Sequence, residues 1–253
     1  MMHPGTLATA PTPPAARRPA AGARSLAPRE HGAYGQLGLP LLTALAMGHL
    51  SAPAALLTIA STAAFFAHEP LLLVAGQRGT RALREEGARA RRRLLALGAL
   101  ATITGALGVA LAPESARIAV LIPLGLAALL APFILKNQEK SAPGELLAAA
   151  ALSSAALPVS LAAGVSGALT ASAWLAWCLT LAASTLAVRS VVAHARGKVP
   201  LTRRLVAPAL ALAVDALAWK AGLLAPAAAI GALPMLLLAL TLGARRLFAH
   251  GGR

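Results

Sequence analysis

The sequence predicts an all-α fold, a polytopic membrane helix bundle with about eight transmembrane helices, and three observations support this prediction. Hydrophobic residues make up 58% of the 253 residues. Charged residues make up 12%, against roughly 25% in soluble domains. The apolar residues form long runs without the alternation of apolar and polar residues that a barrel strand shows, so the runs are expected to be helices.

Eight apolar runs come close to the roughly 20 residues with which a helix crosses about 30 Å of hydrocarbon. They cover residues 34–50, 52–74, 94–111, 117–135, 144–163, 169–190, 205–224 and 225–242. We expect them to form one membrane domain over residues 29–246. Gly35, Gln36, Gly38 and Pro40 interrupt the first run, so whether it crosses the membrane completely stays open.

Arginine and lysine fall in every second gap between the expected spans. Of the 23 basic residues, all except Arg117 and Lys220 lie in the N-terminal tail, around the gaps after the second, fourth and sixth spans, or at the C-terminus. Loops rich in Lys and Arg stay on the cytoplasmic side of a membrane. This pattern predicts an even number of spans, both termini in the cytoplasm, and insertion into the bacterial cytoplasmic (inner) membrane.

The chain ends and two internal segments carry further expectations. Residues 1–28 are rich in Ala, Pro and Arg without apolar periodicity, which predicts a disordered basic cytoplasmic tail, and residues 247–253 form a short second tail. Residues 76–93 are interpreted as a short amphipathic helix on the cytoplasmic membrane surface. Pro158 is expected to kink the fifth span.

Composition excludes several classes of function. The net charge of +15 would indicate nucleic-acid binding in a soluble protein. Here the charge sets the topology and contacts anionic lipid headgroups, so no nucleic-acid partner is expected. Cys178 is the only cysteine, and the spacings His-x-x-x-His and Glu-x-x-His do not occur. We therefore expect no intramolecular disulfide, no metal site and no cofactor.

The densest polar cluster is Arg29-Glu30-His31, just before the first expected span. Arg29 supplies a fixed cation, Glu30 a carboxylate, and His31 a side chain that titrates near neutral pH, so all three are ligand-binding candidates. The alternative is an ordinary helix N-terminus, in which Glu30 lies near the positive end of the helix dipole and Arg29 contacts lipid headgroups.

A second group of polar residues is expected at the cytoplasmic face. His68 and Glu69 lie in the inner part of the second span, where they need a partner or a wet cavity. They are binding candidates or, alternatively, a pair that packs against a cation such as Arg189 and closes the bundle. Lys136, Arg189 and His194 are further ligand-binding candidates, because basic groups can hold phosphate oxygens without a metal. The alternative is that these three only reach the lipid headgroups.

Asp215 is the single aspartate and lies near the middle of the seventh expected span. Ionisable residues inside a membrane span are candidates for proton relays, so Asp215 is the relay candidate. An equally open alternative is a protonated Asp215 that bonds a neighbouring helix.

The string Pro28-Arg29-Glu30-His31-Gly32-Ala33-Tyr34 resembles the signature of the YwiC-like family of bacterial integral membrane proteins. The resemblance extends from Pro28 to about Arg246, with further support from His68-Glu69-Pro70 and from Leu135-Lys136. It implies a multi-pass membrane fold and no particular activity.

From about Ile134 to Arg196 the layout is also similar to the UbiA-type intramembrane prenyltransferases. Those enzymes are helical bundles that hold an isoprenoid diphosphate and Mg²⁺ with two aspartate-rich motifs. This chain has only Asp215, and the adjacent Glu85 and Glu86 point about 100° apart on a helix. The resemblance therefore implies a UbiA-like bundle without Mg²⁺-dependent transfer, which argues against an enzyme.

Three hypotheses about function follow. The first is a cavity on the cytoplasmic side that binds an anionic or isoprenoid lipid, in a protein whose other partner is the lipid bilayer. The second is a transporter of small solutes or ions that uses Asp215 and the His68–Glu69 pair as relay groups. The third is a divergent prenyltransferase in which Glu30, Glu69 or the Glu85–Glu86 pair replaces the missing aspartates. The sequence does not address the oligomeric state.

Overall fold

A computed structural model describes residues 26, 31–195 and 203–248 of the chain. In this part all regular structure is helical, as the sequence predicts. The helices are α1 His31–Met47, α2 Ala52–Val74, α3 Thr80–Leu111, α4 Glu114–Ala119, α5 Leu121–Leu135, α6 Ala142–Ser154, α7 Ala156–Ala162, α8 Gly167–Ala195, α9 Arg203–Lys220 and α10 Pro226–Phe248. The two expected tails lie outside the described residues, apart from Leu26 and residues 247–248, which end α10.

Five helical units are long and apolar enough to cross a membrane. They are Ala52–Val74, Thr80–Leu111, Glu114–Leu135 (α4 with α5), Ala142–Ala162 (α6 with α7) and Gly167–Ser190. These units correspond to the second to sixth expected spans and indicate a multi-pass membrane protein. α1 has 17 residues, α9 carries four charged residues, and the described apolar part of α10 is short. The full number of eight spans therefore stays a prediction.

Proline explains the break between α6 and α7. The two helices are separated at Ala155, where the backbone forms a turn. Pro158 has no N–H to donate to the carbonyl of Ser154, so the hydrogen-bond ladder of the helix is interrupted at this point. The kink expected from Pro158 is confirmed.

The interpretation of residues 76–93 as a separate surface helix was wrong. Thr80 to Leu111 form one helix of 32 residues, about 48 Å long at 1.5 Å per residue. Ala, Leu, Arg and Glu fill its first half, and these residues favour helix, so nothing ends the helix before the apolar half begins. The charged half of α3 thus continues the axis of its apolar half.

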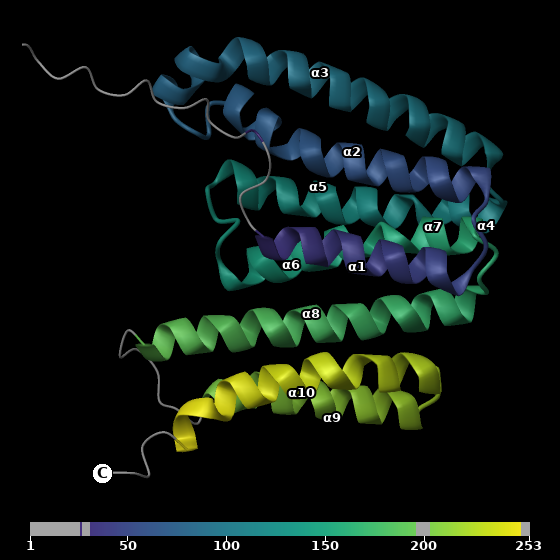
Figure 1. Ribbon diagram of the computed structural model, residues 1–253, viewed down its shortest axis with the longest axis vertical. Coiled ribbons are helices and arrows are strands. Elements are labelled where there is room, and N and C mark those ends of the chain that lie inside the picture. Colours follow the sequence, from purple (N-terminus) through teal and green to yellow (C-terminus); the bar gives the residue numbers. More distant parts are fainter. Residues whose placement is uncertain (1–25, 27–30, 196–202, 249–253) are drawn as a thin grey trace, which may run out of the picture.

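The helices stack in layers (Figure 1). α2 and α3 form one edge of the molecule, α1 and α4 to α7 lie next to them, α8 follows, and α9 and α10 form the opposite edge. The helices α1 to α4, α6 and α7 share a core that includes Leu37, Leu57 and Val159. α8, α9 and α10 have a core of their own, which includes Ala183 and Leu236.

Glycine allows α3 to approach α2 closely. A Cβ atom added at Gly108 would lie 3.0 Å from Leu57 Cγ and 3.2 Å from the Leu57 backbone nitrogen. A Cβ atom at Gly105 would lie 3.5 Å from the Cβ of Ala60, which is ordinary van der Waals contact. Small residues give this kind of close packing between membrane helices. The contact depends on Gly108 in particular.

We expect Gly108→Val to weaken the packing of α3 on α2, because the added side chain meets Leu57 and its backbone. Overpacking of this kind costs about 1–3 kcal/mol, so the melting temperature of the protein in detergent should fall. Gly98→Val is the matched control on the same helix, since no atom lies within 4 Å of a Cβ at Gly98. Equal melting temperatures for the two variants would contradict the role given to Gly108.

Candidate functional site at the basic end

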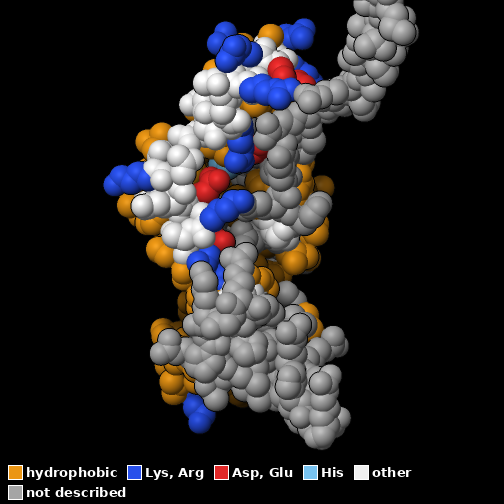
Figure 2. Space-filling view, turned by 90° about the vertical axis from the view of Figure 1, so that its left-hand side faces the viewer, with side chains coloured by type: hydrophobic (Ala, Val, Ile, Leu, Met, Phe, Trp, Pro, Cys, Tyr) orange, Lys and Arg blue, Asp and Glu red, His pale blue; other side chains and the backbone are white. Residues whose placement is uncertain are grey.

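One end of the bundle, which we name the basic end, holds the α2–α3 turn, the α5–α6 loop and the C-terminal part of α8 (Figure 1). The described cations at this end, including those of the charged half of α3, are Arg78, Arg81, Arg84, Arg89, Arg91, Arg92, Arg93, Lys136, Lys140 and Arg189. The described cations near the other end are Arg117 and Lys220. Figure 2 shows the basic end, where many Lys and Arg side chains and a few Asp or Glu side chains lie on the surface.

Glu69 forms a two-pronged ion pair with Arg78. Arg78 Nε donates to Glu69 Oε1 at 3.0 Å, and Arg78 Nη2 donates to Glu69 Oε2 at 2.6 Å. The Glu69 side chain is buried at 3% exposure, and Arg78 is exposed at 26%. The turn after α2 brings Arg78 back to Glu69, and it uses positive φ angles at Gly76 (78°) and Gly79 (90°), which glycine adopts without strain. Such paired geometry is the strongest form of arginine–carboxylate contact.

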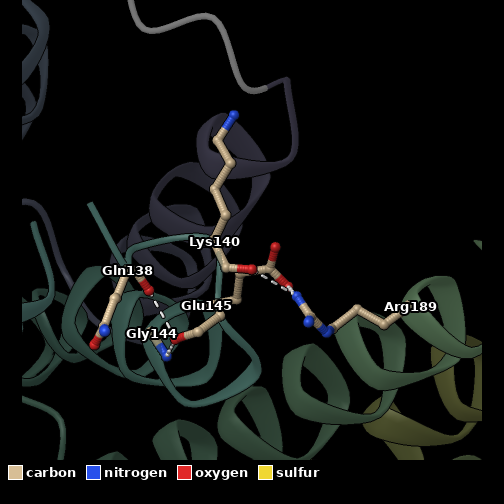
Figure 3. A network of polar contacts seen from close by, with 6 residues as sticks. Gln138, Lys140, Gly144, Glu145 and Arg189 are labelled. Atoms are coloured by element: carbon tan, nitrogen blue, oxygen red, sulfur yellow. Dashed lines mark hydrogen bonds and ion pairs between the residues drawn. The ribbon is translucent and has the colours of Figure 1, made fainter. Parts of the chain in front are cut away.

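Arg189 binds the start of α6 (Figure 3). Its Nη1 donates to Glu145 Oε2 at 2.7 Å and to the backbone carbonyl of Lys140 at 2.9 Å. The loop before α6 is tight at this point. A Cβ at Gly144 would lie 2.6 Å from the carbonyl oxygen of Gln138, so only glycine fits there. Arg189 therefore joins α8 to the α5–α6 loop and to α6.

The α5–α6 loop is held from two sides. Arg189 contacts Lys140 on one side. On the other side Arg78 Nη1 lies 4.0 Å from Glu139 Oε1, so the same arginine contacts both Glu69 and the loop. Arg189 was named as one example of a cation that could pack against Glu69, but Glu69 pairs with Arg78, and Arg189 contacts Lys140 and Glu145 instead. The expectation that Glu69 packs against a cation is confirmed with Arg78 in that place.

Other cations of the basic end are exposed. Arg81 bonds Glu85 at 2.8 Å, but the Arg81 side chain is 87% exposed, and ion pairs in water contribute little. The remaining exposed cations have no ion pair within the described residues; they are Arg84, Arg91, Arg92 and Lys136. This second set is free to meet an anion from outside the protein.

The other predicted site residues are spread over the chain. Arg29 and Glu30 lie outside the described residues. His31 begins α1 and His194 lies in α8, but their side chains are not among those described. His68 is half-buried on α2, next to Glu69. Of the predicted site residues, Glu69 (through Arg78) and Arg189 both contact the α5–α6 loop, but they do not contact each other.

An open groove separates α1 from α2 on the side toward the basic end. Its volume is about 130 Å³, and it is lined by Tyr34, Leu37, Gly38, Leu41, Thr62, Phe65 and Phe66. We name it the α1–α2 groove. Three of its rings pack edge to face, with centroid distances of 5.2 Å for Tyr34–Phe65, 6.0 Å for Tyr34–Phe66 and 5.5 Å for Phe65–Phe66. Sequence reasoning missed the groove, although three of the five Phe and Tyr residues of the chain line it.

Asp215 lies away from this end, in the α8–α10 layer. Its side chain is 3% exposed, and its Oδ1 atom accepts no hydrogen bond from the described residues. Among the described residues, no group of three or more His, Cys, Asp or Glu side chains could hold a metal ion.

Sequence comparison adds the family. The model of the YwiC-like protein family matches residues 27–160, which is more than half of the chain. The chain belongs to the YwiC-like family. The matched part contains the α1–α2 groove, the Glu69–Arg78 pair and Glu145, and it ends before Arg189 and Asp215. No curated protein matches this YwiC-like chain. No solved structure matches it either.

We expect Glu69→Gln to destabilise the protein, because Arg78 loses its charged partner. A hydrogen bond to a charged group contributes about 1.5–3 kcal/mol, and the loss should appear as a lower melting temperature in detergent. Glu85→Gln is the matched control, since Glu85 pairs with an arginine in water, and it should leave the melting temperature almost unchanged. A Glu69→Gln protein as stable as Glu85→Gln would show that the buried pair has no structural role.

We expect Arg189→Ala to loosen the α5–α6 loop, because the carbonyl of Lys140 and the carboxylate of Glu145 lose their shared donor. The measurement is amide hydrogen exchange over residues 136–145, which should become faster. Arg84→Ala removes an unpaired arginine as the control. Unchanged exchange in the Arg189→Ala protein would mean that Arg78 alone fixes the loop.

Proposed function

We propose that this YwiC-like protein binds an anionic lipid, whose hydrocarbon chain is isoprenoid or acyl, without Mg²⁺-dependent transfer. The chain lies in the α1–α2 groove and the headgroup lies at the basic end. By the positive-inside rule this end faces the cytoplasm of the bacterial inner membrane, with eight spans in total. The observation that carries the proposal is an apolar groove in the half of the bundle that also holds exposed cations with no ion pair within the described residues.

The lining of the groove suits a hydrocarbon chain. Aromatic and aliphatic side chains form most of it, and the hydroxyls of Tyr34 and Thr62 are its polar groups. Small-molecule pockets measure about 300–1,000 Å³, so a groove of about 130 Å³ takes part of one chain and leaves the rest of the lipid against the outer helix faces. This supports a lipid taken from the bilayer and disfavours a fully enclosed substrate.

The unpaired cations suit a negative headgroup. Arginine binds phosphate oxygens in a two-pronged geometry, and a basic residue near an anionic membrane surface contributes about 1 kcal/mol. We assign the headgroup contact to the exposed cations Arg84, Arg91, Arg92 and Lys136. Arg29, Glu30 and His31 stay candidates, because they directly precede Tyr34, the first lining residue of the groove.

The two alternatives have less support. A transporter relay through His68 and Glu69 is disfavoured because both oxygens of Glu69 accept from Arg78. A prenyltransferase needs free carboxylates for Mg²⁺. Glu69 and Glu85 both bond arginines, and Glu86 lies 3.4 Å from Arg89.

Filling the groove tests the proposal. An isoprenyl phosphate that binds only the folded protein should raise the melting temperature in detergent. Gly38 lines the groove and has no atom within 4 Å of an added Cβ, so Gly38→Leu should fill the groove without a clash and remove the shift. Gly98→Leu is the control, since Gly98 lies on α3 with equally open space and should keep the shift.

The ligand series separates the remaining explanations. The isoprenol without its phosphate should give a smaller shift, and an anionic phospholipid should give a larger one than a zwitterionic phospholipid. A shift that occurs only with Mg²⁺ would favour the prenyltransferase. Equal shifts in the Gly38→Leu and Gly98→Leu proteins would exclude the α1–α2 groove as the site.

A further inference from the structure

The α8–α10 unit contains a buried acid whose surroundings give it no charged partner. Asp215 lies on α9 between Ala211 and Ala218, which pack into the core of this unit. The Asp215 side chain is 3% exposed, and its Oδ1 atom has no hydrogen-bond partner within the described part of the chain. An ionised carboxylate without a partner is very costly to bury, whereas a protonated one is far less so.

Among the side chains that the structure describes on the packed elements, no basic group faces Asp215. On α8 the titratable side chains of residues 167–190 are Cys178 and Arg189. Cys178 Sγ lies 3.8 Å from Ser153 Oγ of α6, and Arg189 bonds Glu145. Residues 226–241 of α10 contain no titratable side chain. On α9 itself, Lys220 lies five residues after Asp215. It is exposed and points to a different face of the helix.

A second buried polar side chain of this unit lies on α8. The backbone N–H of Ala225, after α9, donates to Ser172 Oγ, which fixes the turn after α9 against the start of α8. Thr180 is 2% exposed and lies between Ala176 and Ala183, which belong to the shared core. The unit therefore buries an acid and a hydroxyl inside an alanine-rich interface.

We propose that Asp215 is a proton-binding site inside the α8–α10 unit. In this conformation the proton forms an O–H bond on the carboxyl group, which keeps Asp215 neutral in its apolar surroundings. The proton leaves to water only when movement of α9 against α8 and α10 exposes the carboxylate. The site is separate from the α1–α2 groove and lies beyond the residues matched by the family.

The test is chemical labelling of the full-length protein in detergent with dicyclohexylcarbodiimide, a reagent that modifies protonated carboxyl groups in apolar surroundings. We expect one adduct per chain, mapped by mass spectrometry to the peptide that contains Asp215, and less labelling as the pH rises. Asp215→Asn should lose the adduct, and Glu85→Gln, which changes an exposed carboxylate, should label like the wild type. Asp215→Glu keeps a carboxyl group and should label at the same peptide.

The wild-type protein alone decides the result, so the test does not depend on the folding of a variant. Labelling at Asp215 that falls with rising pH supports the proton site. Absence of label at Asp215 while the protein is folded overturns it, and so does labelling only at another carboxylate. As a second readout, the infrared C=O stretching band of a protonated carboxylic acid should be present in wild type and absent in Asp215→Asn.

Discussion

The rest of the structure depends on how two arginines hold the α5–α6 loop. Arg78 lies between Glu69 and Glu139, and Arg189 lies between Lys140 and Glu145, so the loop connects the α2–α3 edge of the bundle to α8. Carboxylates near the edge of a membrane are stable only with such partners. One loop therefore carries the arginine contacts between layers, which are joined elsewhere by apolar packing and by hydrogen bonds such as those of Thr170 with Ser160 and Trp177 with Thr43. Arg78 and Arg189 are both paired with glutamates of the protein. An anionic ligand from outside would therefore contact other basic residues, which are exposed.

The sequence was sufficient for those features that depend on composition and single residues. Long apolar runs predicted the helical class, and Pro158 predicted the break before α7. Residues 76–93 were misassigned because a charged helix that continues an apolar one has the same local pattern as a separate surface helix. The partner of Glu69 could not be predicted, since it depends on a turn with two glycines in the left-handed region. The α1–α2 groove also depends on the spacing of two helices, which one sequence does not reveal.

The molecule divides into two parts with different chemistry. The helices α1 to α7 contain the groove, the arginine–glutamate pairs and almost the whole family match. The helices α8 to α10 have a separate core, in which Asp215 is the acidic side chain among alanine and leucine residues. Arg189 is the polar contact that joins the two parts at the basic end. A movement of α8 would therefore reach the α5–α6 loop through Arg189 as well as through the packing of α8 on α6.

The exposure of α5 has a consequence for how this helix responds to the thickness of the bilayer. No residue of α5 is buried, and α5 packs mainly against α6, so few contacts with the rest of the bundle fix its tilt. A helix adjusts its tilt to the thickness of the hydrocarbon layer, and each Å of mismatch between helix length and layer thickness costs roughly a fraction of a kcal/mol. In a thinner bilayer α5 would lean, and its C-terminal end would pull on Lys136 and the residues that follow. A change in bilayer thickness would then shift the loop that Arg78 and Arg189 contact.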